Sequence, residues 1–118
     1  MSIIKDIIFE DFQFAVEDAV RENNKNLLDT MSEFSRSASR LNRAVAYAAT
    51  KCGCISINSE GRGISGRLCE KCRFSAEKEL GELLFSAAAL SSYLGMSMYD
   101  VMLTERRYID LMGKYMPV

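Results

Sequence analysis

The stretch that decides the fold is residues 52–72, CGCISINSEGRGISGRLCEKC, which holds all four cysteines of the 118-residue chain. One short pair, Cys52-Gly53-Cys54, is followed after fourteen residues by a second, Cys69-Glu70-Lys71-Cys72. Each pair can offer two sulfurs to one ion, and the residues between them let both pairs converge on a tetrahedral site. We therefore predict one structural metal ion, preferably zinc, held by Cys52, Cys54, Cys69 and Cys72.

Two other uses of these cysteines stay open. The same four ligands can hold an iron–sulfur cluster, and a Cys-x-x-Cys pair can act as a redox dithiol. A disulfide framework is less favoured, because the chain has neither a signal-peptide core within residues 1–14 nor an apolar run of about 20 residues that could span a membrane. We expect a cytoplasmic protein without a membrane partner, in a compartment where clustered cysteines bind metals.

The cysteines lie between two segments with helical periodicity. Apolar residues recur in steps of three and four over residues 27–48 and again over residues 76–94. A further helix is expected over residues 4–21, and Ser97 with Asp100 forms a capping signal for a fourth. We predict a single all-α domain over residues 1–118, an antiparallel bundle of about four helices. Its central helices pack through their apolar seams, and a metal holds the loop at residues 52–73.

Charge and composition exclude several functions. The chain has 15 Lys and Arg against 16 Asp and Glu, which gives no strong nucleic-acid signal. Residues 36–73 nevertheless carry eight basic residues against two acidic ones, and residues 1–22 are acidic. We expect these segments to pair with each other or across a dimer, with an anion site in the basic segment as the alternative. The chain has no histidine, so Ser-His-Asp and Cys-His mechanisms are excluded.

Two carboxylates lie on one face of the expected third helix. Glu79 and Glu82 are three residues apart, on the side away from the apolar seam. Such a pair can bind Mg²⁺. From the spacing alone, solvated or ion-paired carboxylates are the simpler interpretation.

The surrounding segment, residues 77–105, resembles the second half of the MazG-like nucleotide pyrophosphohydrolases. The resemblance rests on four pieces: Glu79-Leu80-Gly81-Glu82, the apolar run of residues 83–90, Leu94-Gly95, and Ser97-Met98-Tyr99-Asp100. It implies an all-α, oligomeric fold that cleaves nucleoside triphosphates to a monophosphate and pyrophosphate. It also implies that Mg²⁺ is held by carboxylates from both central helices, with Glu79 and Glu82 on the Glu-x-x-Asp positions.

The upstream half departs from that family. Where a Glu-Glu-x-x-Glu motif is expected, only Glu33 is present, and Arg36 and Arg40 follow it. Glu33, Glu79 and Glu82 are thus the candidate Mg²⁺ ligands, and Arg36 and Arg40 are candidate phosphate contacts. We favour a simpler outcome, in which these arginines form ion pairs with Glu79 and Glu82.

Three functions follow from these residues. The first is a divergent, Mg²⁺-dependent nucleotide pyrophosphohydrolase, the second a non-catalytic zinc-stabilised module that binds a nucleotide or a protein, and the third a redox- or metal-responsive regulator. In each case we expect a homodimer or a higher homo-oligomer. The apolar residues of the first helix, with the methionines of the fourth, exceed what a lone bundle can cover.

Overall fold

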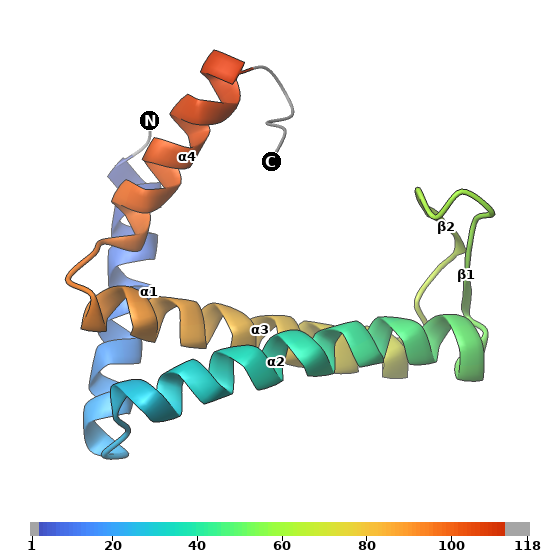
Figure 1. Cartoon of the computed structure of the whole chain (residues 1–118), viewed down its shortest axis with the longest axis horizontal. Helices are drawn as coiled ribbons and strands as arrows, with labels where there is room; N and C mark the ends of the chain where they lie inside the picture. The colour runs from blue at the N-terminus through green and yellow to red at the C-terminus, as the bar shows by residue number, and fades with distance from the viewer. Residues whose placement is uncertain (1–2, 113–118) are drawn as a thin grey trace. The chain divides into compact units, whose positions relative to one another are not determined.

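The computed structural model describes residues 3–112, so residues 1–2 and 113–118 of the predicted domain lie outside the described part (Figure 1). Four helices dominate it, which confirms the all-α class: α1 (Ile3–Glu22), α2 (Leu27–Tyr47), α3 (Glu70–Tyr93) and α4 (Met98–Met112). A π-helical turn, η1 (Ala48–Cys52), directly follows α2. No helix in this part of the chain combines the length and the apolar character that crossing a bilayer requires.

The residues group into two compact units, which we describe separately. Of the described residues, the first comprises residues 3–30 and 87–112, and the second residues 31–86. Helices α2 and α3 contribute to both units.

Small apolar residues form the core of the first unit. Val16 and Val20 of α1 are buried, as are Ala88 and Ala89 of α3. Gln13 of α1 completes the packing with hydrogen bonds. Its Nε2 donates to the Ser92 hydroxyl at 3.1 Å and to the Met96 carbonyl at 2.9 Å, while its Oε1 accepts from the Met98 N–H at 3.0 Å. One side chain therefore ties α1 to the turn that joins α3 to α4.

Side-chain caps begin two of the helices. Asn26 Oδ1 accepts the Asp29 N–H at 2.8 Å ahead of α2, and Ser97 Oγ accepts the Asp100 N–H at 3.3 Å ahead of α4. Both satisfy an amide in the first turn that has no partner within the helix. The predicted Ser97–Asp100 cap is confirmed.

In the second unit, α2 and α3 run antiparallel beside each other and a short hairpin joins them (Figure 1). Strand β1 (Ile55–Ile57) pairs with β2 (Ile64–Gly66), with Ser56 opposite Ser65. The sequence pattern predicts a loop here rather than strands. The signal for strands is two alternating Ile-Ser segments separated by turn residues, but three-residue strands are too short for periodicity to identify.

The two predicted apolar seams are only partly covered in this unit. Met31, Phe34 and Val45 of α2 are 50%, 36% and 41% exposed, and Leu80 of α3 is 46% exposed. Apart from Cys72, the buried residues of α2 and α3 in this unit are two serines, Ser37 at 1% exposed and Ser86 at 4%. Ion pairs of Arg40 with Glu79 and Glu82 also join the two helices here.

Candidate metal centre

The four cysteines come from the ends of secondary-structure elements. Cys52 is the last residue of η1, Cys54 directly precedes β1, Cys69 directly precedes α3, and Cys72 lies in the first turn of α3. The predicted loop at residues 52–73 is therefore shorter and more ordered than expected. Cys52 and Cys72 lie within helical elements, whereas Cys54 and Cys69 lie in the connecting residues that directly precede β1 and α3.

The thiols converge on one point. The sulfur atoms of Cys52, Cys54, Cys69 and Cys72 all lie within 4.8 Å of one another. The Sγ atoms of Cys52 and Cys69 are 3.8 Å apart, too far for a disulfide bond. A zinc–sulfur bond of about 2.3 Å implies tetrahedral sulfur–sulfur edges of about 3.8 Å. The cluster could thus hold a single metal ion such as zinc.

Two glycines give the backbone the turns that this convergence needs. Gly53 has a φ of 76°, in the left-handed region, and its N–H donates to the Ala48 carbonyl at 3.0 Å, so the chain reverses between Cys52 and Cys54. Gly66 has a φ of 86° and pairs with Ile55 across the hairpin. A Cβ on Gly66 would lie 2.6 Å from the Cys54 carbonyl oxygen. The hairpin therefore holds Cys54 in place and requires glycine at position 66.

A small apolar core packs against the cysteine cluster. Ala48, Ile55 and Cys72 are buried together, and Leu68 packs against them. Burial raises the pKa of Cys72 to about 12. The Cys72 N–H donates to Cys69 Sγ at 3.5 Å and lowers the pKa of Cys69 to about 7, because the start of a helix stabilises an anion. A divalent cation bound here would displace the remaining thiol protons.

Arg40 lies among the carboxylates that the sequence offers as Mg²⁺ ligands. Its Nε is 3.0 Å from Glu79 Oε2, and its Nη2 is 3.0 Å from Glu82 Oε2. Burial opposes the charge of Arg40, but hydrogen bonds to Glu79 and Glu82 outweigh it and raise the pKa of the guanidinium. The expected ion pairing is present for Arg40.

Glu33 and Arg36 of α2 belong to the same cluster of charged side chains around Arg40. Arg36 pairs with Glu33 rather than with α3, and Glu33 also lies 3.9 Å from Arg40 Nη2. Among the described residues, the cysteines are the one group whose ligand atoms come together as a metal site would require. Glu33, Glu79 and Glu82 form no second group of this kind, so the arrangement gives Mg²⁺ no support.

No protein-family model, curated protein or solved structure matches the chain. The resemblance to the MazG-like proteins thus rests on the sequence motifs of residues 77–105 alone.

A basic and aromatic cavity, which was not predicted from the sequence, lies beside the cysteines. It measures about 600 Å³ and is lined by residues of α2 and α3, among them Arg43, Tyr47, Phe74 and Lys78. The signal is present in the sequence, because residues 40, 43 and 47 and residues 71, 74 and 78 follow helical spacing. Helical periodicity alone, however, does not predict that these faces of α2 and α3 lie next to each other.

Proposed function

We propose that this chain is a zinc-stabilised, non-hydrolytic helical module of the MazG-like type. The observation that carries the zinc assignment is the convergence of four thiols within 4.8 Å on an apolar base. Protein ligands fill all four positions of a tetrahedral ion, which leaves none open for water or substrate. The metal is therefore structural, and it joins the end of η1 to the start of α3.

Zinc is preferred over iron–sulfur on geometric grounds. A cluster of several irons spreads its cysteine ligands over separate iron atoms and needs wider spacing between sulfurs than one ion does. The 3.8 Å between Cys52 and Cys69 Sγ matches the edge of a single-ion tetrahedron. A lone iron ion fits the same geometry, so metal analysis must distinguish the two.

We infer the lack of nucleotide hydrolysis from the ion pairs that Arg40 forms with Glu79 and Glu82. A pyrophosphohydrolase needs carboxylates that are free to hold Mg²⁺ and orient water. Here the carboxylates of Glu79 and Glu82 are committed to the guanidinium of Arg40. The proposed module keeps the helical framework of the family while an ion pair occupies the position of its catalytic metal.

Cobalt substitution tests the metal assignment directly. Protein refolded with Co²⁺ should show the intense visible and near-ultraviolet absorption of tetrahedral cobalt bound to four thiolates, and zinc should abolish it. Cys72→Ser should weaken the thiolate charge-transfer band, whereas Ser59→Ala, at an exposed residue of the hairpin loop, should leave it unchanged. A spectrum of octahedral cobalt would contradict the proposal.

Hydrolysis is tested separately with the zinc-loaded protein. A panel of nucleoside triphosphates with Mg²⁺ should release no pyrophosphate above background. Brisk release that Glu82→Gln eliminates would make Glu79 and Glu82 an active site and overturn the non-hydrolytic assignment.

The module is proposed to be a homo-oligomer. The seam residues Met31, Phe34, Val45 and Leu80 are exposed in the single chain, as is Leu84 at 48%. An apolar stripe of this kind on paired helices is typical of a surface that packs against a second copy.

A further inference from the structure

The cavity beside the metal centre has the size of a small-molecule site. It occupies about 600 Å³ between the second half of α2 and the first turns of α3. Binding sites for small ligands and cofactors fall within roughly 300–1,000 Å³. The cavity lies wholly within the second unit.

Positive charge dominates its lining. Four cationic side chains face one carboxylate, Glu79, which Arg40 already neutralises. The other three cations are Arg43, Lys71 and Lys78. The side chain of none of the three forms a hydrogen bond or an ion pair with any residue that the structure describes. Unpaired cations from two helices on one concave surface attract an anion with several oxygens, such as a phosphate.

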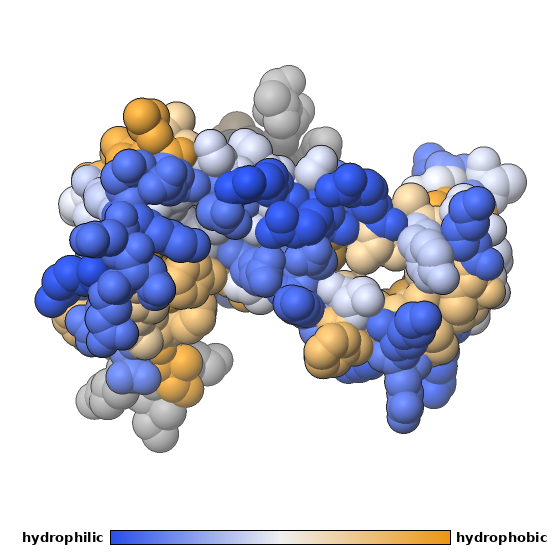
Figure 2. Space-filling model, turned by 90° about the horizontal axis from the view of Figure 1, so that it is seen from below, coloured by the Kyte–Doolittle hydropathy of each residue, from blue (hydrophilic) through white to orange (hydrophobic). Residues whose placement is uncertain are grey.

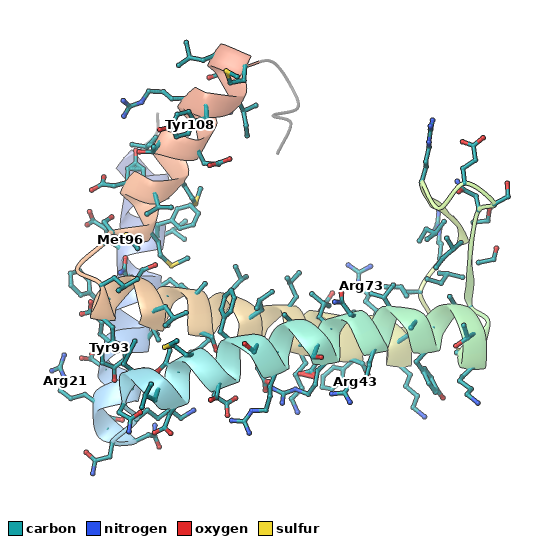
Figure 3. All side chains as sticks on the ribbon, in the orientation of Figure 1. Arg21, Arg43, Arg73, Tyr93, Met96 and Tyr108 are labelled. Atoms are coloured by element: carbon teal, nitrogen blue, oxygen red, sulfur yellow. The ribbon has the colours of Figure 1, made fainter. Side chains whose placement is uncertain are left out.

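These cations do not simply reflect a basic surface. Arg73 is also basic and lies in the first turns of α3, but it does not line the cavity and its Nε pairs with Glu77 at 2.8 Å. Figure 3 shows Arg43 and Arg73 extending to opposite sides of the helix pair. The space-filling view shows hydrophilic residues gathered over the helix pair with apolar residues exposed among them (Figure 2).

Two aromatic rings give the cavity a second kind of surface. Tyr47 lies at the end of α2 and is 48% exposed, while Phe74 lies in α3 and is 70% exposed. Exposed rings at a cavity can stack against a planar group or cover an apolar one. The combination of aromatic rings with unpaired cations suits a ligand that has both a ring and a phosphate.

We propose that this cavity binds a small phosphorylated molecule with a planar ring, of the mononucleotide class, without a divalent cation. Arg43, Lys71 and Lys78 contact the phosphate, and Tyr47 and Phe74 contact the ring. The site goes beyond the zinc-stabilised module proposed above, and it does not use Glu82 or any Mg²⁺ chemistry.

Calorimetric titration of the zinc-loaded full chain, without added Mg²⁺, tests this proposal with three probes. Adenosine monophosphate should bind, and inorganic phosphate and adenosine alone should each bind about tenfold more weakly or worse, because each offers half of the contacts. Lys78→Ala and Arg43→Ala should each weaken adenosine monophosphate about tenfold, the worth of one charge-assisted hydrogen bond. Lys78→Arg should retain most of the binding.

Arg62→Ala is the matched control, since Arg62 is a charged hairpin residue outside the cavity. It should leave binding unchanged. Zinc content and circular dichroism, measured on every variant, separate loss of the ligand from loss of the metal or of the fold.

Three results would overturn the proposal. The first is no heat from adenosine monophosphate at millimolar concentration in protein with its full zinc content. The second is equal weakening by Arg62→Ala, which would mean diffuse charge attraction. The third is evidence that the surface binds a macromolecule instead. Such evidence would be binding of an acidic peptide or a single-stranded oligonucleotide through the same cations more tightly than adenosine monophosphate, or a change in oligomeric state in Phe74→Ala.

Discussion

Arg40 Nε lies 3.0 Å from Glu79 Oε2, and this contact joins α2 to α3 within the second unit. Glu79 is the least exposed of the three carboxylates around Arg40, at 16% of its side chain. The pair therefore has a structural role that a solvated ion pair on the surface would lack.

Replacing Arg40 by Ala should destabilise the second unit measurably, because Glu79 is left half-buried without its cation. We expect a lower urea midpoint for Arg40→Ala and almost none of this loss for Arg36→Ala, whose side chain is 61% exposed. In a Glu79→Gln background, Arg40→Ala should cost less than in the wild type. Equal costs in both backgrounds would show that the two residues are not coupled.

Gly66→Ala should disturb the metal centre although residue 66 is no ligand. The added Cβ would clash with the Cys54 carbonyl, and φ at this position is 86°. We expect a loss of about 1–3 kcal/mol in the free energy of unfolding and weaker zinc retention against a chelator. Gly63→Ala is the control, because a Cβ there meets only the Asn58 side chain at an ordinary 3.5 Å. A stable, fully zinc-loaded Gly66→Ala would refute this role of the hairpin.

Gln13→Ala tests the first unit independently of the metal. The change removes three hydrogen bonds, to Ser92, Met96 and Met98. A loss of about 1–3 kcal/mol in unfolding free energy is expected, while zinc content stays unchanged. Gln13→Glu keeps an acceptor for the Met98 N–H and should fall in between. Chemical denaturation followed by circular dichroism measures both, and identical stability of all three proteins would contradict the assignment.

The oligomer prediction depends on the open apolar seam. Leu80 and Leu84 are 46% and 48% exposed, one helical turn apart on α3. The wild type should be at least a dimer by light scattering at micromolar concentration. A double change, Leu80→Glu with Leu84→Glu, should give a monomer that retains zinc. A monomeric wild type at this concentration would contradict the prediction that the exposed seam packs against a second copy.

The sequence predicts the cysteine site well because the constraint is local. A Cys-x-Cys and a Cys-x-x-Cys pair each place two sulfurs on one side of the backbone, so only their mutual approach is left to the fold. It predicts four helices from their periodicity and the Ser97 cap from its spacing. It does not predict that the seams stay about half exposed, since apolar periodicity does not reveal how much of a seam the neighbouring helix covers. The sequence also leaves open how the helices are joined by polar groups, which the structure shows in the ion pairs of Arg40 with Glu79 and Glu82.

The most direct test of the account is the metal content of the full chain purified under reducing conditions. Elemental analysis should find about one zinc per chain in the wild type and in Arg62→Ala, and far less in Cys72→Ser. One iron per chain would keep the four-thiolate site and change its ion. Protein that is folded and reduced yet contains neither zinc nor iron, with a melting temperature that Cys72→Ser does not alter, would contradict the central claim that a metal holds η1, the hairpin and α3 together.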